Sequence, residues 1–296
     1  MVAALFAGHS VRALVRPSSP RPPTWLNQSG LTVVEGSLDD PKSPPRLMEG
    51  CDALVHLAAM GVQNRQRQFQ TMLESNALLL PAWLASAKLN VKLVVSGGTC
   101  LEYRGQGTLP PVYCEADAPA HLLEEETLVE PLDPYGWTKW IGGLLQRRWA
   151  HQAALPLWYL RFASLIGPED DSEKLIPSAV KAAAKHQSLS LTGGEQVREW
   201  LDVTDAARSI LHALDRQPPG GVELVNVGTG VGVRLRDLVS ELFRIAHADG
   251  ALIHFGDRPY REGDPHHLVM DPSRSRRWLE WEPAQTLEQT IKSLFL

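Results

Sequence analysis

The chain has 296 residues, of which 44% are hydrophobic and 21% charged, as is usual for a globular protein with a substantial core. A net charge of −5 and the lack of a long Lys/Arg run argue against a nucleic-acid partner. The three cysteines, Cys51, Cys100 and Cys114, have no paired short spacing, so we expect neither disulfides nor a metal site. A reducing cytoplasm is the location expected for such a chain. No apolar run approaches the ~20 residues of a membrane-spanning helix, so no membrane association is expected.

Short apolar runs bounded by Gly, Pro or polar residues are typical of buried parallel strands. They predict strands at 11–15, 31–35, 53–57, 91–95, 157–162 and 223–227. Helical spacing of apolar residues predicts helices at 66–89, 135–151, 174–186, 205–215 and 235–247, with Thr204 or Asp205 capping the fourth. Strands alternating with helices indicate right-handed βαβ units and an open parallel sheet.

The alternation loosens after Gly167 and resumes briefly between residues 205 and 230. The sequence therefore predicts an α/β fold, a Rossmann-like doubly wound parallel sheet with a smaller C-terminal substrate lobe. We assign residues 1–166 and 203–230 to the dinucleotide-binding domain, and residues 167–202 and 231–296 to the substrate lobe.

Tyr135 and Lys139 lie four residues apart on a predicted helix and so share one face of it. A free phenol has a pKa near 10, and a nearby ammonium lowers that pKa towards the range useful for proton transfer. By itself the pair is a weak signal, because an amphipathic helix can carry it by accident. Thr99 strengthens it, because a hydroxyl just past a central strand lies where α/β sheets bind ligands. Without Tyr135, Thr99 would be read as a turn residue.

Taken together, the segments resemble the extended short-chain dehydrogenase/reductase family, of the NAD-dependent epimerase/dehydratase type, over nearly the whole chain. The matching pieces, in the family's order, are 8–16, 35–38, 52–59, Asn76, 96–103, 134–139, 160–168, 198–205, 226–228, 261–265 and 278–283. The combination is far more specific than any single piece.

The resemblance implies hydride transfer between a sugar carbon of a nucleotide-sugar and a nicotinamide cofactor. Tyr135 would be the general acid/base, Lys139 its electrostatic partner and a ribose ligand, and Thr99 the hydroxyl that orients the substrate oxygen. Cofactor-binding residues would be Arg16, Ser37, Leu38, Leu57, Ala58, Ala59, Asn76 and Lys139. Substrate would meet Ser164, Arg198 and Arg261, the two arginines gripping the diphosphate. Each arginine could instead form a surface salt bridge.

The sequence departs from the family pattern in three places. Ser164 stands where the family often has an Asn, and the acidic residue expected near Ser37 is absent. The family also opens with a strand and a glycine-rich loop that binds pyrophosphate, whereas Met1 aligns after that loop. We therefore expect the natural start to lie about fifteen to twenty residues upstream, the usual length of that strand and loop.

Arg16 follows the second strand of the family pattern, where an acidic residue would favour NAD. A guanidinium there can hold a 2′-phosphate, so the sequence slightly favours NADP over NAD. The alternative is a solvent-facing arginine at a strand end.

Three functions remain open from the sequence. The chain could be a keto-sugar reductase, a 4-epimerase with tightly held NAD, or a non-catalytic nucleotide-binding relative. The resemblance also implies a possible homodimer through the long helix and the helix of Tyr135. Trp137, Trp140 and Ile141 would serve that interface or the core.

Overall fold

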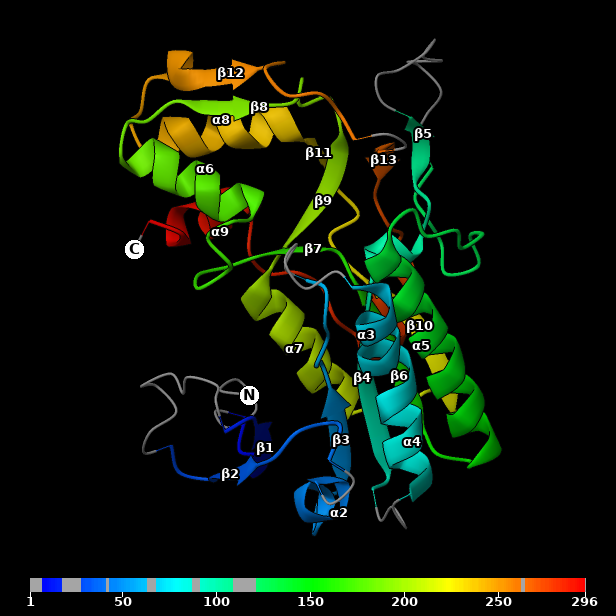
Figure 1. Cartoon of the computed structure of the whole chain (residues 1–296). Coiled ribbons are helices and arrows are strands. Elements are labelled where there is room, and N and C mark those ends of the chain that lie inside the picture. The colour runs from blue at the N-terminus through cyan, green and yellow to red at the C-terminus, as the bar shows by residue number, and fades with distance from the viewer. Residues whose placement is uncertain are drawn as a thin grey trace.

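A computed structural model of the chain describes residues 7–17, 28–40, 43–62, 68–86, 91–108, 121–261 and 264–295. Its central feature is a parallel sheet in the order β10-β6-β4-β3, as Figure 1 shows. The strands are β3 (Ala53–His56), β4 (Leu93–Thr99), β6 (Leu157–Phe162) and β10 (Val222–Val227). Because all are parallel, their carboxyl ends meet at one edge of the sheet. The predicted α/β parallel-sheet fold is confirmed.

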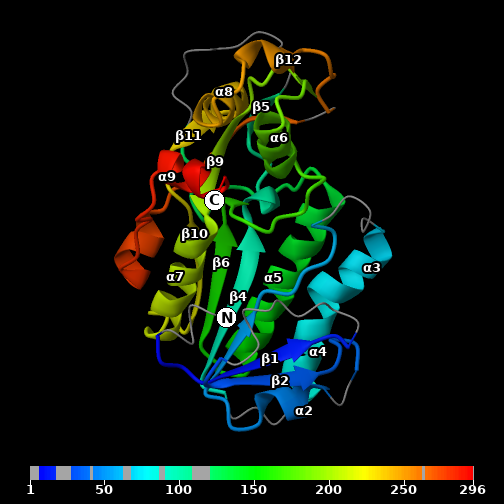
Figure 2. The ribbon, with the colours of Figure 1, turned by 90° about the vertical axis from the view of Figure 1, so that its left-hand side faces the viewer.

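Helices cover both faces of this sheet (Figure 2). One face carries α3 (Phe69–Leu73), α4 (Leu79–Ser86) and α5 (Pro134–Gln152), and the other carries α7 (Val203–Leu214). Strand β6 is buried on both sides. Leu157 and Tyr159 join the core towards α4 and α5, and Trp158 and Leu160 join the core towards α7. An apolar run without alternation is what such a strand requires.

Strands β1 (Val11–Val15) and β2 (Leu31–Glu35) form a separate parallel pair, followed by the short helix α2 (Ser43–Met48). Among the described residues, no strand pairing joins them to the central sheet. Two-stranded sheets are marginally stable alone. We therefore expect β1 and β2 amides to exchange with deuterium before those of β4 and β6, as peptide-level mass spectrometry would measure. Equal protection in the two sheets would contradict this.

A second group of elements packs around its own core, which includes Ile166, Ala179, Leu238, Phe243 and Ile291. Strand β9 (Val197–Asp202) lies at its centre and pairs with β7 (Ser164–Ile166), β11 (Gly232–Arg234) and β13 (Pro265–Leu268), while β13 also pairs with β5 (Gln106–Thr108). The other elements are α6 (Leu175–Ala184), β8 (Leu189–Leu191), α8 (Leu235–Ile245), η5 (Gly250–Leu252), β12 (Ile253–Phe255) and α9 (Leu287–Ser293). The π-helical turn η6 (Ser275–Leu279) instead contributes Leu279 to the core of the central sheet. We propose that the separate cores mark two domains. Met270, Leu279 and Trp281, which the sequence assigned to the substrate lobe, pack in the core of the central sheet.

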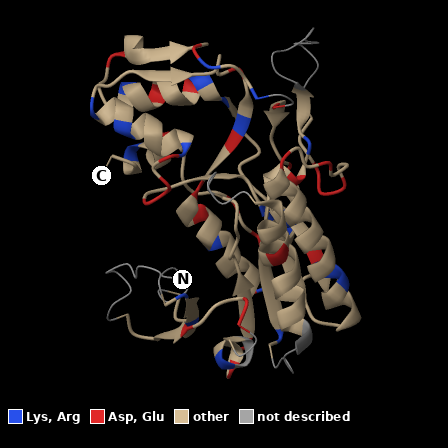
Figure 3. Cartoon of the chain, viewed as in Figure 1, with Lys and Arg blue, Asp and Glu red and all other residues tan. Residues whose placement is uncertain are grey.

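Charges of both signs share the same surfaces, as α8 shows with Arg236, Asp237, Glu241 and Arg244 (Figure 3). In the part of the chain that the structure describes, no helix is long and apolar enough to cross a membrane. Among those same residues, no group of three metal-binding side chains is found.

Three predicted elements differ from the observed ones. The long helix contains a π-helical turn, η3 (Glu74–Leu78), between α3 and α4. Strand β4 continues through Gly97 and Gly98 to Thr99, beyond Val95, where the sequence predicted its end. Helix α7 is capped by Asp202, whose carboxylate accepts from the Thr204 amide, and not by Thr204 or Asp205.

Candidate active site

Helix α5 places Tyr135 in its first turn and Lys139 in the next. Its start is fixed by Asp133, whose carboxylate accepts the Gly136 amide at 2.7 Å, and by Pro134 in the first turn. Residues four apart lie on one helix face, so the two candidate side chains emerge together. Tyr135 is half-buried, whereas Lys139 is buried.

The Lys139 ammonium reaches the sheet and donates to the Gly97 carbonyl of β4 at 2.5 Å. Burial lowers its pKa, because removing water disfavours the charged form, while the nearby Glu102 carboxylate opposes that shift. An ammonium has three N–H donors. This contact uses one, which leaves donors for a ligand at the carboxyl end of β4.

Thr99 is the last residue of β4 and caps the short helix η4 (Cys100–Glu102). Its hydroxyl oxygen accepts from the Leu101 amide at 3.3 Å, and its own amide donates to the Glu102 carboxylate at 2.9 Å. This reciprocal capping box holds the Thr99 backbone at the edge of the sheet where Lys139 bonds to Gly97. The structure thus brings Thr99 and Lys139 to the same strand end.

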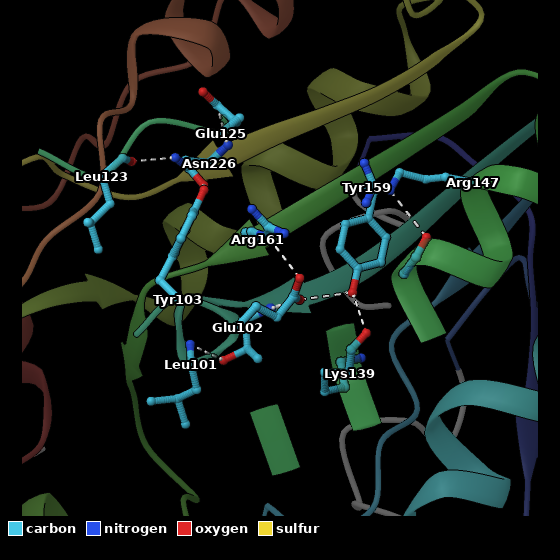
Figure 4. A network of polar contacts seen from close by, with 12 residues as sticks. Leu101, Glu102, Tyr103, Leu123, Glu125, Lys139, Arg147, Tyr159, Arg161 and Asn226 are labelled. Carbon is cyan, nitrogen blue, oxygen red and sulfur yellow. Dashed lines mark hydrogen bonds and ion pairs between the residues drawn. The ribbon is translucent and has the colours of Figure 1, made fainter. Parts of the chain in front are cut away.

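Beneath these residues lies a buried polar network that the sequence did not assign (Figure 4). Arg161 of β6 donates from Nε to Glu102 at 2.8 Å, and both side chains are 1% exposed. The Tyr159 hydroxyl lies 2.9 Å from the same carboxylate and 3.0 Å from the Lys139 carbonyl oxygen. The available signal was a charged residue, Arg161, within an otherwise apolar strand, since such a residue needs a buried partner.

The predicted cofactor residues fall into separate places. Leu57, Ala58 and Ala59 are exposed immediately after β3, with Leu57 at 49%. Arg16 is exposed after β1. Ser37 and Leu38 are half-buried after β2, and the Leu38 carbonyl accepts from the indole of Trp83 at 2.6 Å. Their cofactor contacts stay predictions.

Asn76 is buried in the π-helical turn. Its Oδ1 accepts from the Met60 amide at 2.8 Å, and its Nδ2 donates to the Met60 carbonyl at 2.9 Å and to the Thr138 hydroxyl at 3.0 Å. The side chain therefore ties the loop after β3 to helix α5. Its predicted contact with the cofactor stays a prediction.

The predicted substrate residues lie in and around the β9 sheet. Ser164 begins β7 and is half-buried. Arg198 of β9 forms an ion pair with Asp264 at 2.8 Å and is 13% exposed, so a substrate phosphate would share this guanidinium with a carboxylate. Arg261 is exposed.

His56 ends β3 and is buried; its Nε2 is among the buried side-chain atoms that have no hydrogen-bond partner in the described part of the chain. Desolvation, together with the charge of Lys139, lowers its pKa to about 3. The unfolded chain binds a proton between pH 6.5 and 3 that the folded chain rejects. Stability should therefore fall with decreasing pH in this window, by up to about 1.4 kcal/mol per pH unit.

The variant His56→Gln should flatten this acid dependence in urea unfolding measured from pH 7 to 4. The exposed His254 of β12 provides the control, since His254→Gln should leave the slope unchanged. Equal slopes in the wild type and His56→Gln would refute the assignment.

Comparison with known proteins adds family information to this geometry. A model described as the NAD dependent epimerase/dehydratase family matches residues 1–228. UDP-arabinose 4-epimerase 1 of Arabidopsis thaliana is 26% identical over 291 residues, covering 89% of this chain and 65% of that protein. The dTDP-glucose 4,6-dehydratase of Escherichia coli is 31% identical over 199 residues, covering 62% and 54%. The chain thus spans between about half and two thirds of the length of these curated relatives.

Two solved structures share the fold over nearly the whole chain. The UDP-glucose 4-epimerase of Thermotoga maritima, crystallised with UDP-glucose, has a TM-score of 0.85 at 23% identity, covering 99% of this chain and 92% of that one. The UDP-glucuronic acid 4-epimerase of Bacillus cereus, crystallised with NAD, has a TM-score of 0.80 at 20% identity, with the same coverage.

Proposed function

Because this chain belongs to the NAD-dependent epimerase/dehydratase family, we propose that it is a nucleotide-sugar 4-epimerase with Tyr135 as its acid/base. The observation that carries the proposal is the meeting of helix α5 with the carboxyl end of β4. Lys139 bonds to Gly97 there, and Thr99 stands two residues further on. The names of relatives support the reaction class, since several are UDP-sugar 4-epimerases.

In the proposed reaction Tyr135 removes the proton from a sugar hydroxyl and later returns it. Thr99 holds the reacting oxygen by a hydrogen bond. The Lys139 ammonium, one helical turn from Tyr135, favours the phenolate form. NAD, when bound, supplies the hydride acceptor and donor.

The residues at this strand end fit a nicotinamide ribose. Lys139 is a buried cation with donors beyond the one given to Gly97, and ribose hydroxyls are suitable acceptors. The exposed Leu57 offers an apolar surface at the neighbouring end of β3. We propose NAD as the cofactor, because related structures were crystallised with it. The NADP preference argued from Arg16 is retained as the alternative.

An epimerase is favoured over a dehydratase because the Glu102 carboxylate already accepts hydrogen bonds from other protein groups. Water elimination needs a group that protonates the departing hydroxyl. Glu102, the carboxylate three residues beyond Thr99, is buried and already accepts from Arg161 and the Thr99 amide.

The keto-sugar reductase is the second candidate, since Arg16 is exposed where it could meet a 2′-phosphate.

Incubation with a panel of UDP- and dTDP-sugars, with NAD or NADP, tests the proposal. Chromatography would identify the sugar product while absorbance at 340 nm follows the cofactor. An epimerase forms product without net cofactor change, whereas stoichiometric NADPH consumption would replace it by the reductase. Nucleotide binding without turnover of any sugar would favour the non-catalytic relative. Tighter binding of NAD than NADP would refute the Arg16 argument.

We expect Arg261→Ala to raise the KM for the nucleotide-sugar about 10- to 100-fold with little change in kcat, because a charge-assisted hydrogen bond to phosphate contributes roughly 1.5–3 kcal/mol. Steady-state kinetics on the preferred sugar would measure this. Arg258 is also exposed, three residues earlier, and Arg258→Ala serves as the matched control. An unchanged KM in Arg261→Ala would remove Arg261 from the proposed substrate contacts.

A further inference from the structure

We infer that Glu102 is a positioning residue, held by Arg161, that fixes Thr99 relative to the helix of Tyr135 and Lys139. The inference deepens the proposed function and rests on it. The contacts run from one catalytic element to the other. Glu102 Oε1 accepts the Thr99 amide at 2.9 Å and lies 2.9 Å from the Tyr159 hydroxyl, which lies 3.0 Å from the Lys139 carbonyl oxygen (Figure 4).

The carboxylate is itself immobilised. Arg161 donates to Oε2 at 2.8 Å, so the two oxygens of Glu102 are held from different sides. The guanidinium lies over the ring of Tyr103, 4.5 Å from its centroid, and the Tyr103 hydroxyl donates to Asn226 of β10 at 2.9 Å. The network is therefore anchored to three strands of the sheet: β4, β6 and β10.

Packing leaves the network little freedom to shift. A Cβ on Gly98 would lie 2.6 Å from Glu102 Oε1, and one on Gly143 of α5 would lie 2.5 Å from Cζ of Tyr159. Both positions are glycine because the carboxylate and the ring occupy that space. A displacement of Glu102 would consequently be transmitted to Thr99 on one side and to α5 on the other.

The same carboxylate acts on Lys139 through its charge. Burial lowers the Lys139 pKa, and Glu102 counters that shift. A residue that holds the Thr99 backbone and also favours the charged form of Lys139 affects the chemical step more than substrate binding, because neither role requires contact with the sugar.

The kinetic test uses Glu102→Gln in the full chain, with the sugar turned over by the wild type. We expect kcat to fall about 10- to 100-fold, as a misplaced catalytic group does, with KM within about twofold of the wild type. Tyr159→Phe, which leaves the Glu102–Thr99 bond in place, is the second variant if Glu102→Gln folds poorly. This variant should lower kcat by about tenfold, because it removes only the link between Glu102 and helix α5 and so misplaces α5 but not Thr99.

Ser96→Ala is the matched control. Ser96 donates to Gln146 at 2.6 Å, a buried contact that also joins β4 to α5 but does not reach Thr99. A kcat loss in Ser96→Ala equal to that in Glu102→Gln would overturn the inference, as would a kcat within twofold of wild type in both Glu102→Gln and Tyr159→Phe.

Amide exchange separates this inference from the proposed function. In Glu102→Gln the Thr99 amide should lose protection while the amides of β10 keep theirs, and in Tyr159→Phe the Thr99 amide should stay protected. If the wild type turns over no nucleotide-sugar, the proposed function fails and this exchange pattern still decides the positioning. Unchanged protection of Thr99 in Glu102→Gln would overturn it.

Discussion

Replacing Tyr135 with Phe should reduce kcat about 10²- to 10⁴-fold, the usual contribution of a positioned general acid/base. The phenyl ring retains the packing of a half-buried side chain in the first turn of α5 and loses only the hydroxyl. Thermal unfolding and NAD binding should therefore stay near wild-type values. Steady-state turnover of the preferred nucleotide-sugar, with NAD affinity from fluorescence titration, would measure both effects.

Lys139→Met is the companion to this experiment. It should also abolish most turnover, but unlike Tyr135→Phe it should weaken NAD binding, since Lys139 is proposed to bond the ribose. A Tyr135→Phe variant that keeps more than about a tenth of wild-type kcat would fall outside the range for general acid/base catalysis. Tyr135 would then no longer be assigned the proton transfer.

Breaking the Glu102–Arg161 pair should give the largest loss of stability. Both side chains are 1% exposed and 2.8 Å apart, so Arg161→Met leaves a carboxylate buried without its cation. Such a change costs roughly 3–5 kcal/mol, measured as the free energy of unfolding in urea. The double variant Arg161→Met with Glu102→Leu should recover most of that loss, because an apolar pair leaves no buried charge unpaired.

The exposed pair of Lys92 and Asp52 provides the control for this cycle. Its atoms are also 2.8 Å apart, but the side chains are 76% and 80% exposed. Solvent screens such a pair, so Lys92→Met should leave the unfolding free energy unchanged. If Arg161→Met behaved like Lys92→Met, the buried pair would contribute nothing beyond an exposed one.

Elements with a strong local pattern were predictable from the sequence. The strand at 157–162 and the helix of Tyr135 could be placed because a short, mostly apolar run and helical spacing are local properties. The π-helical turn at 74–78 could not be predicted, because its cause is tertiary. Helix α5 contacts it there, and Asn76 reaches from it to Met60 and Thr138.

The candidate site was predictable where spacing or family order applied and unpredictable where partners are distant in sequence. Tyr135 and Lys139 are neighbours on one helix, and Thr99 follows a recognisable strand. Glu102 and Arg161 are 59 residues apart, and nothing in either segment indicates the other. Strand β4 runs on through Gly98, beyond the predicted end at residue 95, because a glycine required by packing and one that ends a strand look the same in sequence.

The glycines at 98 and 143 set how close helix α5 can come to the sheet, and this has a consequence for variation in the chain. Neither has a side chain that could take part in chemistry, yet any larger residue would collide with Glu102 or Tyr159. In a saturation-mutagenesis library selected for activity, these two positions should tolerate as few substitutions as Tyr135 itself. A map of tolerated substitutions would thus outline the space between helix and sheet as clearly as it outlines the reacting groups.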